Sequence, residues 1–325
     1  MPPHNMGKTL MKTVMKIVGW LLLAVVLVAA GGVATSWAPD RDVESLKARW
    51  APAPSQFVDI MGMSVHVRDE GPRDDAEPIV LLHGTSASLH TWDGWTEALK
   101  GQRRVIRMDL PGFGLTGPMP DGNYRLTRYS EFVIALMDHL GVQKAVLAGN
   151  SFGGNLAWKV AVDHPQRVSK LVLVDAAGYP YDAQSVPIGF KIAQIPALKP
   201  LMQNTLPRSM IDSSVRNVYG DPSKVTDELV DRYYELTLRA GNRAALGERF
   251  SQSPGGEFAQ QIPSITQPTL ILWGGQDRLI PPNNAEKFKQ DIRGSRVVMF
   301  DALGHVPHEE DPAATVAAVQ AFLAP

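Results

Sequence analysis

The sequence contains no cysteine in its 325 residues. That absence excludes disulfide bonds, thiolate catalysis and cysteine-based zinc sites, although it does not indicate a compartment. An excess of charge of one sign is also lacking, since 32 Lys and Arg residues face 33 Asp and Glu residues, for a formal net charge of -1. There is no basic block with interleaved aromatic residues and no internal repeat. Nucleic acid is therefore not an expected partner.

Charge is missing altogether between Ile17 and Pro39. As a helix, the apolar run IVGWLLLAVVLVAAGGVA (17–34) would be about 27 Å long, close to the roughly 30 Å hydrocarbon core of a bilayer. Lysines precede this run, at positions 8, 12 and 16, and acidic residues follow it. The pattern predicts a transmembrane anchor, with the short N-terminus in the cytoplasm and the main domain exported, to the periplasm if the source is bacterial. A cleaved signal peptide and secretion are the alternative.

The remainder of the chain alternates between strand-like and helix-like segments. A short charged helix and a Pro/Ala linker (39–55) precede a hairpin around Met61-Gly62. Continuous apolar runs then predict buried strands at 78–84, 104–114, 145–151, 170–178, 269–277 and 296–305. Helical patterns occur at 88–100, 126–141, 152–163 and 313–324. This alternation predicts an α/β fold, a mostly parallel twisted sheet with helices on both faces.

The alternation stops between residues 179 and 261, where the pattern is helical and rich in apolar residues. An insertion between two sheet strands should lie over the carboxyl ends of the strands, where open α/β sheets bind ligands. We therefore expect four parts: a cytoplasmic stub and anchor (1–38), a linker (39–55), an α/β core (56–178 and 262–325) and a helical cap (179–261). The apolar residues of the cap could line an acyl pocket or form the cap's own core.

Ser151 lies in the motif GNSFG, between Gly149 and Gly153. A strand-like run ends at this serine and a helix-like run follows it, which is the context that a G-x-S-x-G nucleophile elbow requires. The two glycines fit a sharp, strained turn in which neighbouring side chains would collide with the strand and the helix. The alternative is a plain Gly-rich turn between a strand and a helix.

A serine hydroxyl is a poor nucleophile at neutral pH and needs a base within hydrogen-bond reach. Asp277 ends one later strand-like run and His305 ends the next, so the chain order is nucleophile, acid, base. All three would lie at the carboxyl ends of neighbouring parallel strands, where remote residues converge. Asp175 also follows a strand and competes for the role of the acid, and Asp301 is a weaker competitor.

The segment HGTSAS (83–88) follows the first core strand and could supply an oxyanion hole. The backbone N–H groups of Thr85 and Phe152 can point at one oxygen and stabilise its developing negative charge. Asn150, beside the candidate nucleophile, could contact substrate or brace the turn.

The other histidines and the tryptophans considered as candidates are expected to have structural roles. His305 and His308 in HVPH could suggest a metal pair, but no further ligands are spaced for a metal site. His83 and His164 are expected to be structural. Trp92, Trp95 and Trp158 could line a pocket, but tryptophans at helical spacing more often belong to the apolar core. We expect neither a metal nor an organic cofactor.

From about residue 55 to the end, the chain resembles the α/β-hydrolase family. It carries HGTSAS, DLPGFG, GNSFGG, GGQD and GH in the family's order. It is most similar to the branch of esterases, lipases and carbon–carbon hydrolases with a helical cap, and membrane-anchored monoacylglycerol lipases offer a partial parallel for the N-terminal helix. The resemblance implies that Ser151 is the nucleophile, that His305 is general base and then acid, and that Asp277 is the orienting carboxylate.

Departures from other branches narrow the expected substrate. Haloalkane dehalogenases and epoxide hydrolases use an aspartate nucleophile, whereas position 151 is serine. Carbon–carbon hydrolases of ring-cleavage products often carry tryptophan after the catalytic histidine, where this chain has Val306. We therefore expect a carboxylesterase or lipase acting on a small-molecule or lipid-like ester of an apolar acid. The alternatives are a carbon–carbon bond hydrolase and a non-catalytic binding module on a hydrolase scaffold.

Overall fold

The computed structural model describes residues 6–198 and 203–324, and its centre is one eight-stranded sheet. The strand order is β1-β2-β4-β3-β5-β6-β7-β8. The strands are β1 (Gln56–Ile60), β2 (Met63–Glu70), β3 (Ile79–Leu82), β4 (Val105–Met108), β5 (Ala145–Asn150), β6 (Val168–Val174), β7 (Thr269–Gly274) and β8 (Arg296–Phe300).

The sheet is parallel from β4 to β8 and antiparallel at its other edge. β2 pairs antiparallel with both β1 and β4, and the β1–β2 hairpin turns at Met61 and Gly62, whose φ angles are 55° and 76°. The remaining neighbours pair parallel, with Leu82 opposite Gly149 and Asn150 opposite Val174. The expected α/β architecture with a mostly parallel sheet is confirmed.

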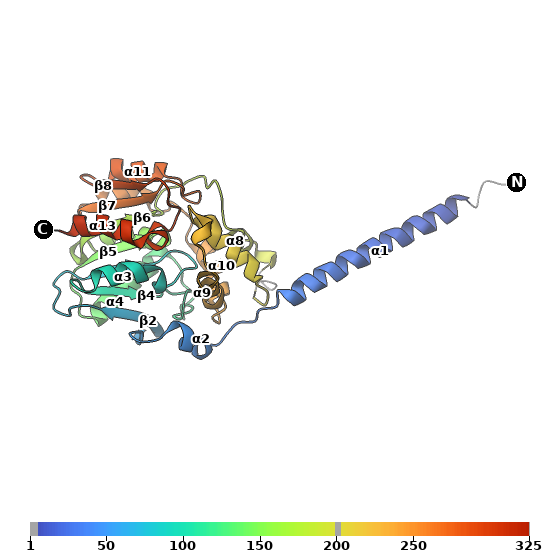
Figure 1. Cartoon of the computed structure of the whole chain (residues 1–325), viewed down its shortest axis with the longest axis horizontal. Coiled ribbons are helices and arrows are strands. Elements are labelled where there is room, and N and C mark those ends of the chain that lie inside the picture. The colour runs from blue at the N-terminus through green and yellow to red at the C-terminus, as the bar shows by residue number, and fades with distance from the viewer. Residues whose placement is uncertain (1–5, 199–202, 325) are drawn as a thin grey trace.

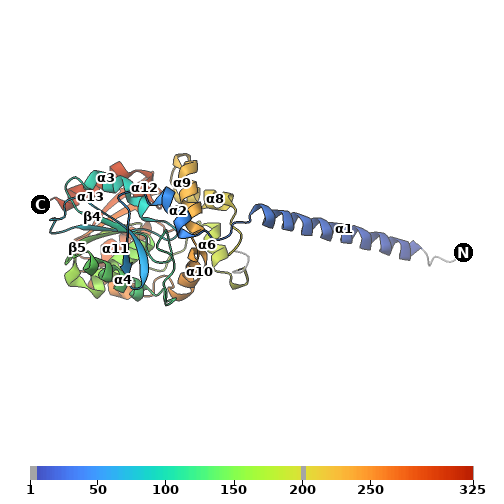
Figure 2. The same cartoon turned by 90° about the horizontal axis from the view of Figure 1, so that it is seen from below.

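Helices cover both faces of the sheet, as Figures 1 and 2 show. The side chains of β3 alternate between two apolar cores, because successive residues of a strand point to opposite faces. Ile79 and Leu81 pack with α3 (Asp93–Leu99) and α13 (Pro312–Leu323), whereas Val80 and Leu82 share a core with α4 (Leu126–His139), α5 (Phe152–Asp163) and α11 (Asn283–Asp291). This two-sided burial explains why the central strands have continuous apolar sequences.

Several strands are shorter than the apolar runs that predicted them. β4 ends at Met108, β6 at Val174, β7 at Gly274 and β8 at Phe300. The residues after β4 and β6 are still largely buried, whereas the chain becomes exposed soon after β7, at Gln276, and after β8, at Asp301, so hydrophobicity alone does not mark where a strand ends. The helix expected at 88–100 is a 3-10 turn (Leu89–Trp92) followed by α3.

Among the described residues of the insertion between β6 and β7, 175–198 and 203–268, there are four α-helices, which form the cap. They are α6 (Ile188–Ala193), α8 (Arg208–Val218), α9 (Asp227–Thr237) and α10 (Asn242–Gln252), with short 3-10 turns at Pro196–Leu198, Pro222–Lys224 and Ala259–Ser264. A further 3-10 turn, Pro165–Arg167, and the short α12 (Pro307–Glu310) belong to the core. In Figure 1 the cap lies at the end of the molecule from which the N-terminal helix projects.

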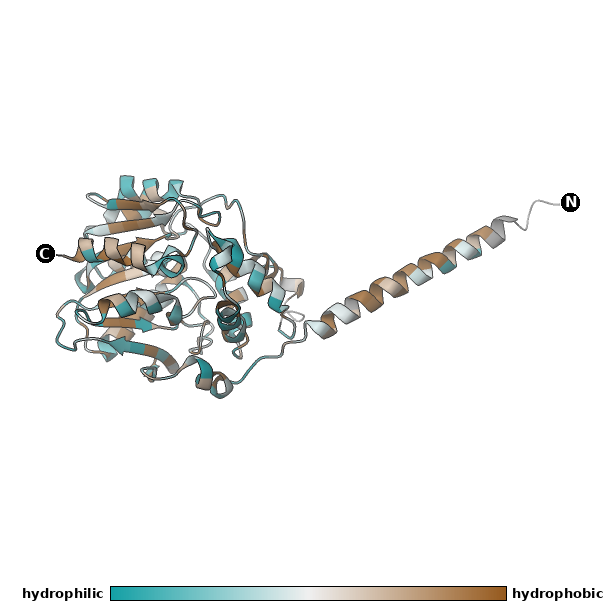
Figure 3. Cartoon of the chain, in the orientation of Figure 1, coloured by the Kyte–Doolittle hydropathy of each residue, from teal (hydrophilic) through white to brown (hydrophobic). Residues whose placement is uncertain are grey.

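The N-terminal helix α1 (Met6–Thr35) stands away from the body of the molecule. Within its stretch from Leu10 to Thr35, an 18-residue segment has a mean hydropathy of 2.5 and is not buried, so the helix is long and apolar enough to cross a membrane or to act as a signal sequence. Figure 3 shows apolar residues along most of its length.

The short charged helix expected within the linker segment 39–55 is α2 (Val43–Trp50). Asp42 caps this helix by accepting a hydrogen bond from the N–H of Glu44. Leu46 and Trp50 are buried in a small apolar cluster with Leu115 of the core and Leu236 of cap helix α9. The segment therefore packs against the cap and the core.

Candidate active site

Ser151 occupies a sharp turn between β5 and α5. Its backbone angles, φ 54° and ψ -116°, are strained for a non-glycine residue. The backbone holds this geometry through a hydrogen bond from the Ser151 N–H to the carbonyl of Val174 (3.0 Å) and another from the Ala177 N–H to the Ser151 carbonyl (3.0 Å). A serine held in this way projects from the carboxyl end of the strand, as a nucleophile elbow requires.

The flanking glycines allow two backbone segments to pass at close range. A Cβ on Gly149 would lie 2.1 Å from the carbonyl oxygen of Gly153, and a Cβ on Gly153 would lie 2.1 Å from that of Leu82. Both distances are far inside van der Waals contact, and the opposing atoms are backbone atoms that cannot rotate away. The GNSFG pattern is thus explained by the packing of α5 against β5 and β3.

We expect Gly153→Ala to lower the free energy of unfolding by about 3 kcal/mol and to lower activity, because the added methyl group displaces the backbone that carries Ser151. Gly101→Ala is the matched control, since a Cβ there has no atom within 4 Å. Thermal or urea unfolding of both variants measures the effect. Equal stability of the two variants would show that the turn tolerates a side chain.

The imidazole of His305 is held by Asp277. Asp277 follows β7 and His305 lies in the loop after β8, and a hydrogen bond of 2.7 Å joins His305 Nδ1 to Asp277 Oδ2. The other carboxylate oxygen, Oδ1, accepts from the N–H groups of Leu279 (2.8 Å) and Ile280 (2.9 Å). Both side chains are buried. This arrangement fixes one ring tautomer and leaves Nε2 to accept a proton.

The two competing aspartates are placed differently. Asp175 lies beside the pair formed by Asp277 and His305. One carboxylate oxygen of each aspartate and one ring nitrogen of His305 lie within 4.8 Å of one another. Its Oδ1 accepts from the N–H of Gly274 (2.9 Å), and burial together with the charge of Asp277 raises its pKa well above the usual range. This shift favours the neutral form of the Asp175 carboxyl group. Asp301 is exposed in the turn after β8.

The N–H groups of Thr85 and Phe152, which are expected to form the oxyanion hole, lie near Ser151 on different segments of the chain. Phe152 is the first residue of α5, so its N–H has no partner within the helix. Thr85 is in the loop after β3, and His83 orders this loop by donating from Nδ1 to the Gly84 carbonyl (2.7 Å) and accepting at Nε2 from the Leu110 N–H (2.9 Å). Burial lowers the pKa of His83, which keeps its ring neutral. The role of His83 is structural.

The family model for the α/β hydrolase fold matches residues 77–312 of the chain. The chain belongs to the α/β-hydrolase family. The match spans the elbow, the Asp277 and His305 loops and the cap, and it supports hydrolase activity.

Similarity to individual proteins extends over most of this α/β hydrolase. A 2-hydroxy-6-oxononadienedioate/2-hydroxy-6-oxononatrienedioate hydrolase of a Pseudomonas species is 30% identical over 264 residues, covering 77% of this chain and 90% of the relative. A meta-cleavage product hydrolase from Pseudomonas fluorescens has a TM-score of 0.70 at 26% identity, covering 82% and 96% of the two chains. A membrane phospholipase A shares the fold over 97% of this chain and 98% of its own, with a TM-score of 0.71 at 24% identity.

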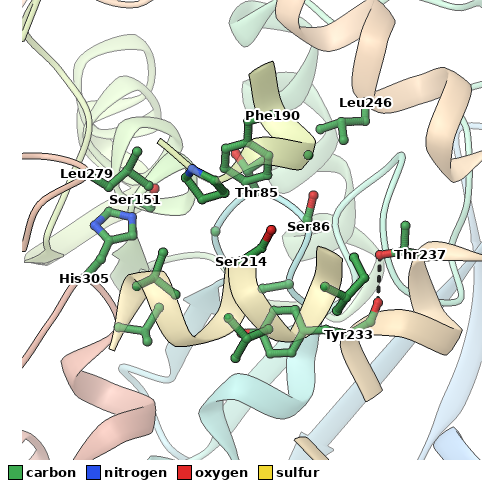
Figure 4. Close-up of a pocket in the computed structure, with 18 of the residues that line it drawn as sticks. Thr85, Ser86, Ser151, Phe190, Ser214, Tyr233, Thr237, Leu246, Leu279 and His305 are labelled. Carbon is green, nitrogen blue, oxygen red and sulfur yellow. Dashed lines mark hydrogen bonds between the residues drawn. The ribbon is translucent and has the colours of Figure 1, made fainter. Parts of the chain in front are cut away.

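A pocket in this α/β hydrolase lies between the core and the cap. It contains about 970 Å³ of space, including its open mouth, and Ser151 and His305 lie side by side at one end of it in Figure 4. Tyr233, Thr237 and Leu246 lie at the other end. Its lining is mostly apolar and comes from both domains: Ala87, Pro187, Phe190, Leu206, Met210, Ile211, Val215, Val218, Leu246, Leu279 and Val306. Phe190, one of the apolar residues of the cap, thus lines the pocket. Residues 201 and 202 of the same apolar stretch fall outside the described residues.

Asn150 braces the site of this hydrolase from the core side. Its side-chain amide donates to the carbonyl of Val174 (3.2 Å) and to that of His305 (2.9 Å), which ties the elbow to the histidine loop. Asn150 also lines the pocket, but its amide hydrogens are engaged by these two carbonyls. The structure thus favours the bracing alternative.

The cap holds the histidine loop from the other side. The His305 N–H donates to the carbonyl of Val218 (2.7 Å), and the carboxylate of Glu310 accepts from the N–H groups of Gly220 (2.9 Å), Asp221 (2.8 Å) and Gly304 (2.8 Å). The position of His305 therefore depends on the cap. Sequence reasoning missed Glu310, because nothing near it in the sequence indicates that two of its partners, Gly220 and Asp221, lie 90 and 89 residues earlier.

The remaining candidates lie outside the pocket. His308 is buried against the ring of Trp92 (centroids 4.0 Å apart) and bonds through Nε2 to Thr91 Oγ1 (3.0 Å). His164 ends α5. The tryptophans at 92, 95 and 158 are all buried in the two apolar cores.

Proposed function

We propose that this chain is a serine hydrolase of carboxylic esters with apolar acyl groups. The observation that carries the proposal is the apolar pocket that ends at Ser151 and His305. Transfer of each acyl methylene from water to such a pocket contributes about 0.8 kcal/mol, so a pocket of this character binds an acyl chain in preference to a charged group.

The charge within the pocket wall supports the same conclusion. Arg243 of α10 is the arginine among the lining residues, and its guanidinium pairs with Asp40 at 2.5 Å. The pair leaves the wall without a net charge at that point. Nη1 of Arg243 has no hydrogen-bond partner, but the pair as a whole is neutral, so a substrate carboxylate would be desolvated there without meeting a net positive charge.

In the proposed reaction, Ser151 Oγ attacks the ester carbonyl while His305 Nε2 takes its proton. The N–H groups of Thr85 and Phe152 stabilise the oxyanion, and Asp277 stabilises the imidazolium that forms. His305 then donates that proton to the leaving alcohol, which leaves an acyl-enzyme on Ser151. Water, deprotonated by His305, attacks the acyl-enzyme and releases the acid.

We further propose that α1 is an uncleaved anchor and that the substrate is lipid-like. Ala38 is buried against Leu206 and Leu238 of the cap, and the Leu206 N–H donates to the Ser36 carbonyl (2.9 Å). Only a few residues thus separate the apolar helix from the cap, so a membrane-spanning α1 would hold the cap at the bilayer surface. Trp37 is 58% exposed beside this junction. The three lysines before the apolar run favour export of the hydrolase domain, to the periplasm in a bacterium.

Cell fractionation and N-terminal sequencing test the anchor. The proposal predicts a full-length protein in the membrane fraction, with its catalytic domain accessible to protease added from the periplasmic side. A soluble mature protein beginning near residue 39 would replace the anchor by a signal peptide.

The second candidate function is carbon–carbon bond hydrolysis. It is favoured by the 30% identity to a hydrolase that is named for dioate substrates. The two candidates differ in substrate charge, because a dioate carries two carboxylates. Steady-state hydrolysis of p-nitrophenyl esters from acetate to palmitate, beside turnover of a vinylogous diketone ring-cleavage product, separates them. Turnover of the diketone alone would establish the second candidate, and no turnover with no covalent labelling by a fluorophosphonate would favour a binding module.

We expect Leu246→Trp to shift the preferred acyl chain to shorter lengths. Leu246 lies at the opposite end of the pocket from Ser151 in Figure 4, so a larger side chain shortens the available space. The ratio of kcat/KM for long against short esters should fall by about 10-fold, the equivalent of losing two buried methylene groups. Leu246→Met is the volume-matched control and should preserve the profile.

A further inference from the structure

Arg249 of cap helix α10 is a buried cation next to the proposed oxyanion hole. Its side chain is shielded by two aromatic rings, with Cζ 4.5 Å from the ring centroid of Phe152 and 4.5 Å from that of Phe250. Its Nη2 donates a hydrogen bond to Thr85 Oγ1 at 3.0 Å. Only 6% of the residue is exposed.

The surroundings of Arg249 are unusual for a buried arginine. Buried arginines are normally paired with carboxylates, because an unpaired charge in a low-dielectric interior is costly. Within residues 6–198 and 203–324, we find no carboxylate paired with Arg249; its polar contact is a threonine hydroxyl and the nearby ionisable groups are Tyr129 and Tyr181. Burial lowers its pKa, but a guanidinium remains charged at any physiological pH.

The two core residues that Arg249 contacts are the two whose N–H groups would hold the oxyanion. Thr85 comes from the loop after β3 and Phe152 from the start of α5, so one cap side chain contacts the side chains of both residues. Arg249 is not among the residues that line the pocket, which means that it acts through Thr85 and Phe152.

We propose that Arg249 is a positioning residue for the oxyanion hole, which fixes Thr85 and Phe152 and supplies an uncompensated positive charge behind them. This inference rests on the proposed function of Ser151. The negative charge on the substrate oxygen develops only as the tetrahedral state forms. A preorganised positive charge therefore lowers the energy of the transition state more than that of the bound substrate.

The test compares Arg249→Met with wild-type protein in full-length form, with p-nitrophenyl esters as substrate. We expect kcat to fall roughly 30-fold, somewhat less than the 100-fold or more that follows removal of a direct oxyanion donor, with KM within about 2-fold. Affinity for a trifluoromethyl ketone, which forms a tetrahedral oxyanion on serine, should fall by the same factor as kcat. Arg216→Met is the matched control on cap helix α8, where Arg216 pairs with Asp212 (3.0 Å), and should keep both values.

Two further variants separate positioning from general support of the fold. Arg249→Lys retains the charge without the planar group that stacks on Phe152, and should recover part of the lost kcat. Thr85→Val removes the Oγ1 acceptor but keeps the Thr85 N–H, and its effect should be non-additive with that of Arg249→Met. If Arg249→Met does not fold, Arg249→Lys and Thr85→Val still decide the matter, because positioning predicts a loss of kcat at constant KM in both.

The outcomes are distinguishable from failure of the proposed function. Unchanged kcat and inhibitor affinity in the folded Arg249→Met variant would overturn the inference while ester hydrolysis stands. A rise in KM at constant kcat would also overturn it, since it would assign Arg249 to substrate binding. Absence of ester turnover in the wild-type protein would instead contradict the proposed function itself.

Discussion

Replacing Ser151 by alanine is expected to lower kcat for ester hydrolysis by a factor on the order of 10⁶. The hydroxyl oxygen is the atom that would form the acyl-enzyme, and in the described structure Ser151 lies beside His305 at the end of the apolar pocket. The fold should be unaffected, because the strained turn is held by backbone hydrogen bonds at Val174 and Ala177 rather than by the hydroxyl. Steady-state kinetics with p-nitrophenyl esters, together with thermal unfolding, measures both.

Ser214 provides the control for this prediction. It lines the same pocket from cap helix α8, and its hydroxyl donates to the carbonyl of Met210 (2.7 Å). Ser214→Ala removes a hydroxyl group from the pocket wall and should therefore have little effect on kcat. A variant at Ser151 that retained more than a few per cent of activity would exclude Ser151 as the nucleophile.

The second large effect is expected at Asp277. Asp277→Asn keeps the shape of the side chain but replaces the carboxylate that accepts from His305 Nδ1, so the imidazole loses its preferred tautomer and the imidazolium loses its counter-charge. A comparable substitution in serine proteases lowers kcat by about 10⁴-fold, and we expect a loss of that order here. KM should change far less.

Asp175 makes this prediction specific. Its pKa is raised by burial and by the charge of Asp277, which favours the neutral carboxyl group that an amide resembles. Asp175→Asn should therefore retain kcat to within about 10-fold. Equal losses in Asp175→Asn and Asp277→Asn would show that the two carboxyl groups act as one unit, and a larger loss at Asp175 would reverse the assignment.

The order of elements and the position of the elbow could be predicted from the sequence for physical reasons. Strands buried on both faces have continuous apolar runs, and Gly149 and Gly153 are required wherever α5 approaches β5 and β3 at backbone contact. Since the carboxyl ends of parallel strands share one edge of the sheet, the sequence also predicts that Asp277 and His305 lie close together.

Other features could not be predicted because they depend on contacts between remote segments. The apolar run at 296–305 overestimates the length of β8, because the chain turns after Phe300 at the exposed Asp301 and Ala302 and then enters the buried histidine loop. The charged sequence of the segment 39–55 predicts a short helix but gives no indication that Leu46 and Trp50 find an apolar site on the core and cap. Glu310 and Arg249 carry no local motif, and their roles follow from partners on other elements.

The most direct test of the central claim is covalent labelling of the full-length protein with a fluorophosphonate, followed by mass mapping of the adduct. The account predicts one label per chain, located on Ser151, and no label on Ser151→Ala. Slow labelling of Asp277→Asn should accompany its loss of kcat. A label at another residue would contradict the assignment of Ser151 as the nucleophile. Full ester hydrolysis by the Ser151→Ala variant would contradict it as well.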